Sequence, residues 1–181
     1  AGTLNHIPYE KIERKKYDVI EPKKFLYKNN KNKVLINKFY NNLKVVPNNN
    51  YDRIISCAVL EHLEDLPKYL YLSTKKLKKN GFQSHSIPCE GYPVWDIAWY
   101  LMSGISFKLR TGQNFKDVQN HEHINSYDEI LSLINFFYKK VEIKFSYPGF
   151  FIPSLSLYAN ITFSNPKKKN MERYKKINKK I

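Results

Sequence analysis

Apolar runs of strand length alternate along this chain with helix-length segments whose apolar residues share one face. The clearest run, Ile54 to Leu60, is continuous and bounded by turn signals, which predicts a strand buried on both faces. Asp65 then predicts a helix N-cap, with Pro67 in the first turn. We expect this helix to end at lysines and Gly81. In an open α/β sheet, ligands bind beyond the carboxyl ends of such strands.

The alternation continues toward the C-terminus. Phe82 to Pro88 predicts a strand, and Val94 to Phe107 is an apolar, tryptophan-bearing segment of helical length. Ser126 and Glu129 form a capping box before a helix with one apolar face. Two closing strands are predicted at Val141 to Tyr147 and Tyr158 to Ser164. This order predicts an α/β fold with parallel strand pairing.

Composition narrows the class of protein. The chain has 181 residues, which predicts one domain with a sizeable core, and its 14 Tyr and 11 Phe argue against disorder. The formal charge of +15 is typical of proteins that bind nucleic acid or anionic membranes. Lys and Asn are however scattered through all segments, which favours a general compositional bias over a nucleic-acid footprint.

Cysteine use and hydropathy indicate a cytoplasmic protein. Cys57 and Cys89 are the only cysteines and have no metal-ligand spacing, so we interpret them as reduced thiols. No apolar run approaches the roughly 18 to 20 residues of a membrane span, and no signal peptide is visible.

The segment from Tyr51 to Pro67, YDRIISCAVLEHLEDLP, resembles the fourth-strand region of class I S-adenosylmethionine (SAM)-dependent methyltransferases. In that family an apolar strand leads through Leu-Glu-His and an acidic residue into a helix. Two further segments resemble family landmarks in the right order. Tyr17 to Pro22 resembles the second strand with its acidic end, and Ala1 to Thr3 resembles the tail of the glycine-rich loop.

The resemblance implies a SAM site. Glu21 is expected to accept hydrogen bonds from the ribose hydroxyls, and Gly2 is expected to allow close backbone approach to the cofactor. Asn41 and Asn42 follow the implied third strand, Val34 to Tyr40, where the family usually has an Asp that contacts adenine. The residues implied to bind SAM are Ala1, Gly2, Thr3, Glu21, Asn41, Asn42, Cys57 and Ala58.

The same resemblance implies a Rossmann-like, doubly wound sheet with an antiparallel strand at its C-terminal edge. The family's first strand has no counterpart here, which predicts an N-terminally truncated product with unpaired strand edges in the centre of the sheet. The methyltransferase domain is expected to cover residues 1–166, with an insertion at about 90–124. Residues 167–181 are expected to form a basic tail, mobile or loosely helical, with too few apolar residues to pack.

Substrate recognition is expected in the insertion, where Glu90, Trp95 and Arg110 are the candidate contacts. The alternative interpretation is that the tryptophan lies in the core and the cation in solvent. His62 and His85, which end neighbouring strands, are candidate bases for a hydroxyl nucleophile. Either could instead be structural, because methyl transfer needs mainly in-line proximity.

The motif His121-Glu122-His123 lacks further ligands with suitable spacing, so we interpret it as part of a pocket rim and predict no metal.

The predicted function is SAM-dependent methyl transfer to an oxygen or nitrogen of a small molecule or a cell-surface sugar precursor. The oligomeric state is left open. Two alternatives remain at this stage: an inactive methyltransferase remnant, and a basic nucleic-acid-binding protein whose affinity falls steeply with salt.

Overall fold

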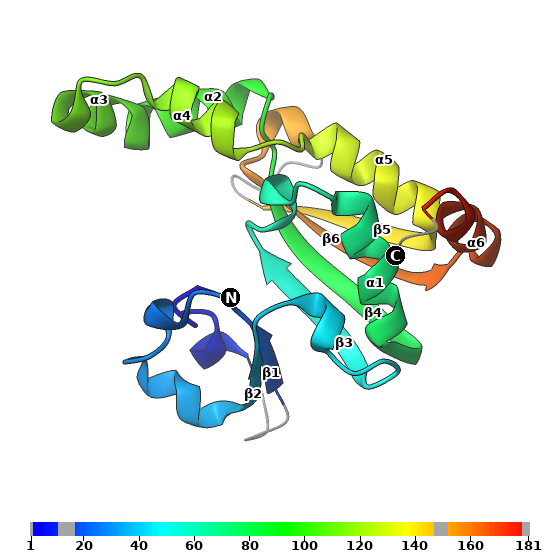
Figure 1. Cartoon of the computed structure of the whole chain (residues 1–181). Coiled ribbons are helices and arrows are strands. Elements are labelled where there is room, and N and C mark those ends of the chain that lie inside the picture. The colour runs from blue at the N-terminus through cyan, green and yellow to red at the C-terminus, as the bar shows by residue number, and fades with distance from the viewer. Residues whose placement is uncertain (1, 11–16, 147–151, 179–181) are drawn as a thin grey trace.

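The computed structural model describes residues 2–10, 17–146 and 152–178, whose strands form two sheets (Figure 1). A two-stranded parallel sheet pairs β1 (Tyr17–Ile20) with β2 (Ile36–Tyr40). The second sheet has the order β3 (Tyr51–Cys57), β4 (Leu77–Pro88), β6 (Tyr158–Pro166) and β5 (Tyr138–Ser146). The pair β3–β4 is parallel, whereas β4–β6 and β6–β5 are antiparallel. The C-terminal antiparallel edge therefore has the predicted arrangement.

The two sheets are separated between β1 and β3. Among the described residues no strand pairs with both of these edges. Side chains connect them instead: the Tyr51 hydroxyl donates to Asp18 Oδ2 at 2.6 Å, and Arg53 pairs with Glu10. The separation falls where the resemblance implied a missing strand.

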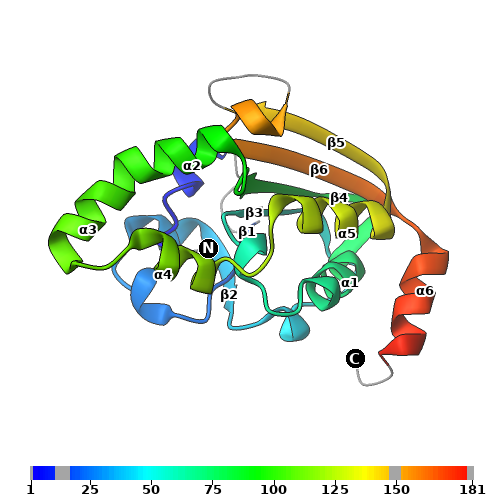
Figure 2. The ribbon, with the colours of Figure 1, turned by 90° about the horizontal axis from the view of Figure 1, so that it is seen from above.

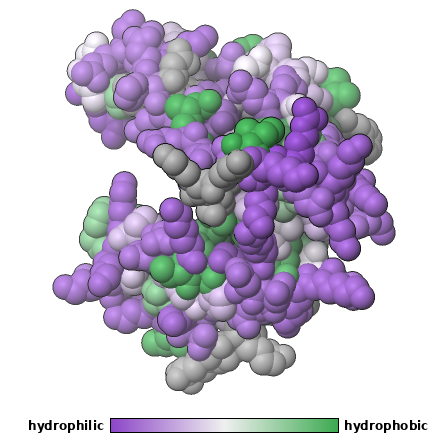
Figure 3. Space-filling view, turned by 45° about the vertical axis from the view of Figure 1, so that its right-hand side comes forward, coloured by the Kyte–Doolittle hydropathy of each residue, from purple (hydrophilic) through white to green (hydrophobic). Residues whose placement is uncertain are grey.

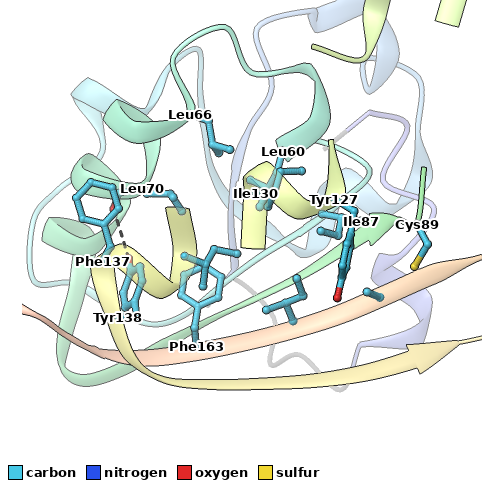
Figure 4. Close-up of a cluster of buried hydrophobic side chains, with 13 residues drawn as sticks. Leu60, Leu66, Leu70, Ile87, Cys89, Tyr127, Ile130, Phe137, Tyr138 and Phe163 are labelled. Atoms are coloured by element: carbon cyan, nitrogen blue, oxygen red, sulfur yellow. Dashed lines mark hydrogen bonds between the residues drawn. The ribbon is translucent and has the colours of Figure 1, made fainter. Parts of the chain in front are cut away.

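One hydrophobic core lies between the four-stranded sheet and two helices, α1 (Leu66–Lys76) and α5 (Tyr127–Phe137). Both helices cover the same face of the sheet, as the view from above shows (Figure 2). Leu70 of α1 and Ile134 of α5 are fully buried in this core, together with Phe163 of β6 (Figure 4).

A second, smaller core supports the β1–β2 sheet. Its buried members are Leu4, Ile7, Val19 and Ile36. Short 3₁₀ turns connect the segments of this part of the chain, at Ile7–Tyr9, Lys24–Leu26, Lys31–Leu35 and Leu43–Val45. Two further 3₁₀ turns, Leu60–His62 and Pro153–Leu155, lie later in the described chain. The N-terminal segment that contains Gly2 and the strand β1 therefore rest on a core of their own.

Both predicted helix starts are confirmed. Asp65 Oδ1 accepts the Lys68 N–H at 3.1 Å, and Ser126 and Glu129 make both bonds of the capping box. The predicted end of α1 at Gly81 is wrong, because Leu77 leaves the helix to pair with Tyr51 of β3. Gly81 instead lies at a register shift, where a Cβ atom would come within 3.0 Å of the Tyr51 carbonyl oxygen.

The strand predicted at Ile54 to Leu60 forms, but its bounds and its burial differ from the prediction. It starts at Tyr51 and ends at Cys57, because Ala58 adopts a positive φ of 49°. Its residues are half-buried or exposed, since β3 is the edge strand of its sheet. Continuous apolar character therefore did not mean burial on both faces.

The predicted helix from Val94 to Phe107 forms as three consecutive pieces: α2 (Pro93–Trp99), a π-helical turn (Tyr100–Gly104) and α3 (Ile105–Thr111). Helix α4 (Phe115–Glu122) then leads back toward the sheet. Together these helices extend from one end of the molecule (Figure 1). The described part of the predicted insertion is thus a largely helical arm.

The basic C-terminal segment packs, contrary to the prediction that it has too few apolar residues to do so. Residues Lys168–Ile177 form α6. The Tyr174 ring lies 5.5 Å from the Phe137 ring and 5.4 Å from the Tyr71 ring, measured between centroids. Met171 packs against the same core. Two well-placed apolar residues were sufficient.

The Tyr138 hydroxyl connects the sheet to α1. It accepts from Gln83 Nε2 at 2.6 Å, contacts the Thr74 hydroxyl, and donates to the Leu70 carbonyl at 3.3 Å. Tyr138, Gln83 and Leu70 are buried, and Thr74 is half-buried.

Replacing Tyr138 by Phe should lower the free energy of unfolding by about 1–3 kcal/mol, because the buried Gln83 amide loses its acceptor. Urea denaturation would measure the change. Tyr9→Phe is the matched control at an exposed position and should stay within about 0.5 kcal/mol of the parent. Equal stability of the two variants would contradict the assigned network.

Candidate functional site

Glu21 follows β1 directly, and its carboxylate organises the N-terminal loop. Oε2 accepts the Gly2 N–H at 2.7 Å, and Oε1 accepts the Lys23 N–H at 3.0 Å. Only 8% of Glu21 is exposed. Gly2 has a φ of +55°, a conformation that favours glycine, and no atom lies within 4 Å of where its Cβ would be.

The electrostatics of Glu21 favour the ionised form. Burial, the largest single influence, would raise the pKa of this carboxyl group, but several lowering influences, led by the hydrogen bonds from the Lys23 and Gly2 N–H groups, together hold the pKa below its ordinary value. The site therefore presents a negative charge with part of its hydrogen-bonding capacity already used by backbone donors.

Asn41 and Asn42 lie beside Glu21 because β1 and β2 are parallel and Ile20 pairs with Tyr40. Asn42 Oδ1 accepts the N–H groups of the two residues that open the next 3₁₀ turn, at 2.9 and 3.3 Å. Asn42 Nδ2 donates to Asn41 Oδ1 at 3.0 Å, and both residues are exposed.

The remaining residues implied to bind SAM lie in several places. Thr3 follows Gly2, and its carbonyl oxygen accepts a hydrogen bond from Asn30 Nδ2. Cys57 and Ala58 are exposed at the end of β3, on the other sheet. Ala1 lies outside the described residues. The structure thus brings Gly2, Glu21 and the Asn pair together, and places Cys57 and Ala58 at a separate strand end.

The two candidate bases, His62 and His85, have different hydrogen-bond partners. His85 is 1% exposed, and its two ring nitrogens contact Ser56 Oγ at 2.6 Å and Gln83 Oε1 at 3.1 Å. Burial lowers the pKa of His85 to about 3. His85 lies on the face of β4 that packs against the core, so its ring belongs to a buried polar network.

A second group of ionisable residues gathers beyond the ends of β3 and β4. It comprises Glu61, His62, Glu90 and His123, and we call it the acid–base cluster. His123 Nδ1 contacts Glu90 Oε2, and the His62 and His123 rings are 4.6 Å apart edge to face. His62 and Glu90 were singled out from the sequence. The motif of His123 was interpreted as part of a pocket rim, and its contact with Glu90 was not predicted.

Of the other predicted substrate contacts, Trp95 lies beside the acid–base cluster, with its ring centroid 6.4 Å from that of His123. Trp95 is 2% exposed and stacks on Trp99 with ring centroids 5.3 Å apart, as the core interpretation expected. Arg110 is exposed on α3, where its guanidinium bonds to the hydroxyl and carbonyl oxygens of Ser106. Glu90 and the buried Trp95 therefore both lie against His123, whereas Arg110 does not.

The described surface has few features that point to other ligands. No group of three or more His, Cys, Asp or Glu side chains in the described ranges could hold a metal ion. None of the described helices has the length and apolar character to cross a membrane. Hydrophilic residues cover most of the face in Figure 3. A hollow of about 670 Å³ beside Asn5, Tyr9 and Asn30 includes none of the predicted site residues.

Comparison with known proteins gives matches in structure. No protein-family model matches the chain, and no curated protein matches its sequence. Three SAM-dependent methyltransferases of known structure are similar in fold. The Thermotoga maritima protein, described as a possible histamine N-methyltransferase, aligns with a TM-score of 0.55 and 12% identity over 92% of this chain and 88% of its own.

The other two are close to the first in similarity. The Archaeoglobus fulgidus enzyme has a TM-score of 0.57 and 14% identity over 90% of each chain. The Mesorhizobium loti enzyme has a TM-score of 0.51 and 14% identity over 83% of this chain and 80% of its own. This chain has the fold of the class I SAM-dependent methyltransferases. At these identities the likeness concerns the methyltransferase fold alone.

The buried state of His85 predicts a pH dependence of stability. The unfolded chain takes up a proton at this residue near pH 6.5, whereas the folded chain resists protonation down to pH about 3. The free energy of unfolding should therefore fall by about 1.4 kcal/mol per pH unit below pH 6.5 through this residue.

Urea denaturation between pH 7 and pH 4.5 would test this contribution. His85→Gln should show a shallower loss of stability on acidification than the parent chain. His121→Gln removes an exposed imidazole and should keep the parent slope. Identical slopes for parent and His85→Gln would show that the native His85 titrates normally.

Proposed function

We propose that this protein binds SAM and transfers its methyl group to an oxygen or nitrogen of a small molecule or a sugar precursor. The observation that carries the proposal is the ionised, largely buried Glu21 at the carboxyl end of β1 in a methyltransferase fold. This is the position where nucleotide-binding α/β sheets use an acidic residue to hold ribose.

The residues present fit the cofactor. A carboxylate has about four acceptor positions, so Glu21 offers the kind of acceptor that ribose hydroxyls require, in a loop where the N–H groups of Gly2 and Lys23 hold it in place. The open space beside Gly2 leaves room for a ligand close to the backbone. The Asn41 amide oxygen, which accepts one hydrogen bond from Asn42, would be the acceptor for the adenine amino group, whereas the Asn42 oxygen already accepts two N–H groups. Cys57 and Ala58 would line the methionine end.

Bound SAM would supply an electrophilic methyl group. The chain's own task is then to hold the acceptor atom in line with that methyl and to exclude water, which accounts for most of the acceleration in such a displacement. The arm formed by α2, α3 and α4 lies at the end of the molecule where β3 and β4 finish (Figure 1). We infer that this arm contributes to the acceptor site, as expected for the 90–124 insertion.

A second candidate function follows from the separation of the two sheets. A cofactor floor divided between β1 and β3 is also what an inactive methyltransferase remnant would present. The two candidates differ in one property, the binding of SAM by the folded chain.

Isothermal titration calorimetry with SAM tests the proposal directly. Glu21→Gln should weaken SAM binding about 10- to 100-fold, because hydrogen bonds to a charged group contribute roughly 1.5–3 kcal/mol. Glu142→Gln removes an exposed carboxylate on β5 and should leave the affinity unchanged. Urea denaturation would check that both variants are folded.

The absence of SAM binding by the folded parent chain would favour the inactive remnant. Equal affinity of Glu21→Gln and the parent would mean that SAM, if bound, does not use this carboxylate.

A further inference from the structure

The acid–base cluster is built from three segments that follow three different elements. Glu61 and His62 lie in the 3₁₀ turn after β3, and Glu90 lies in the loop after β4. His123 follows α4. Because β3 and β4 are parallel and Cys57 pairs with Ser86, both loops leave the same edge of the sheet. That edge is where α/β sheets bind ligands.

Backbone hydrogen bonds hold the three segments in place. The Glu61 carbonyl accepts the N–H groups of Ile124 and Asn125 at 2.9 and 3.1 Å. Asn125 Nδ2 donates to the Leu63 carbonyl at 2.7 Å and to the Leu60 carbonyl at 3.1 Å. The segment that carries His123 is thus fastened to the turn that carries His62. A site held this way is preorganised for a ligand.

The partners of the two imidazoles define their tautomers. His62 Nδ1 lies 3.0 Å from the Glu122 carbonyl oxygen, which can only accept a hydrogen bond. His123 Nδ1 contacts the Glu90 carboxylate, which is likewise an acceptor. Both rings therefore carry a proton on Nδ1. In the neutral imidazole this makes Nε2 the basic nitrogen.

Glu61 adds a buried carboxyl group that lacks a partner. Glu61 is 1% exposed, and its Oε2 has no hydrogen-bond partner among the described residues. Burial raises the pKa of Glu61, and the charges of His62, His123 and Glu90 all act on it. Buried polar atoms are nearly always hydrogen-bonded, so an orphaned acceptor calls for a donor from outside the chain.

The cluster is also linked to the strand end that is proposed to line the methionine part of SAM. Burial raises the pKa of the Tyr158 phenol, and the charges of Cys57 and Glu61 raise it further. Along the chain, the 3₁₀ turn that carries Glu61 and His62 begins two residues after Ala58, so the cluster follows this strand end directly. The acid–base cluster is on the side where the methyl acceptor has to approach.

The groups that the cluster offers are predominantly acceptors: the carboxyl groups of Glu61 and Glu90 and the Nε2 atoms of His62 and His123. We propose that the cluster binds a protonated primary or secondary amine and removes its proton before methyl transfer. This inference rests on the proposed function and narrows its acceptor to nitrogen. An ammonium group fits because it brings several donors and a positive charge to an acidic site.

The proposed steps balance. An ammonium proton passes to Nε2 of one imidazole, which becomes imidazolium and leaves a neutral amine with a free electron pair. That pair attacks the methyl carbon of SAM, so that a C–N bond forms while the C–S bond breaks and its electrons return to sulfur. The products are a methylated ammonium ion and the neutral thioether. Besides accepting from the ammonium group, Glu90 is a positioning residue for His123 in this scheme, because its Oε2 contacts His123 Nδ1.

The first experiment measures ligand binding without SAM, by NMR of the imidazole Cε1–H signals. 2-Phenylethylamine is the probe, and 2-phenylethanol is its uncharged counterpart of the same shape. The amine should shift the signals of His62 and His123, and the alcohol should not. Absence of shifts with the amine, or equal shifts with both probes, would overturn the proposal.

Variants locate the amine site. Glu90→Gln should weaken amine binding at least about tenfold, since it removes an anionic acceptor. Glu61→Gln should also weaken it, because it removes the carboxyl oxygen that has no partner among the described residues. Glu64→Gln removes an exposed carboxylate from the same loop and should bind the amine like the parent. Because Glu61 is buried, its replacement also tests folding, so the Glu90 variant decides the outcome. Unchanged affinity in folded Glu90→Gln would contradict the assignment.

A nitrogen-15 NMR measurement separates positioning from a merely structural role. In the parent, His62 and His123 should both appear as Nδ1–H tautomers. Glu90→Gln should return His123 toward a mixture of tautomers and leave His62 unchanged. An unaltered His123 tautomer would remove the positioning role of Glu90.

The outcomes are independent of SAM binding. Binding of SAM without binding of the amine would leave the proposed function and reject this acceptor site. Binding of the amine without binding of SAM would support the amine site and reject the proposed function.

Discussion

The packing of α1 and α5 on one face of the four-stranded sheet is the constraint on which the rest of the structure depends. It buries Leu70, Ile134 and Phe163 completely and fixes where the strands end. Because the loops after β3 and β4 start from those strand ends, the same packing places the acid–base cluster. The Tyr138 hydroxyl network reinforces it by connecting α1 to β4 within the core.

The two candidate sites differ in how they are supported. The site around Glu21 rests on the small N-terminal core and is held by backbone donors from Gly2 and Lys23. The acid–base cluster rests on the main core and is held by Asn125. Side chains such as Tyr51 and Asp18 connect the two parts. A methyl transfer would require the ligands of both sites to meet, which makes the junction between β1 and β3 the part of the molecule on which activity depends most.

Local sequence signals predicted the elements that depend on local physics. The caps at Asp65 and Ser126 are confirmed because a capping side chain satisfies N–H groups only three residues away. Signals that depend on distant partners were less reliable. The apolar run at Ile54 predicted a doubly buried strand, yet whether a strand is central or at an edge depends on segments remote in sequence. Likewise, the apolar content of residues 167–181 gave no indication that Tyr174 finds Phe137.

The sequence by itself determined the α/β class, the methyltransferase fold that the structural neighbours share, and the acidic residue at the end of β1. These features follow from patterns of a few neighbouring residues, which act on the local structure of the chain. Only the tertiary structure decided which histidine is buried and which histidines lie against each other. His85 alternates into the core and loses access to solvent, whereas His123, 61 residues beyond His62, is brought against it by hydrogen bonds to the Glu61 carbonyl. Sequence spacing carries no information on such contacts, because burial and long-range pairing are properties of the packed chain.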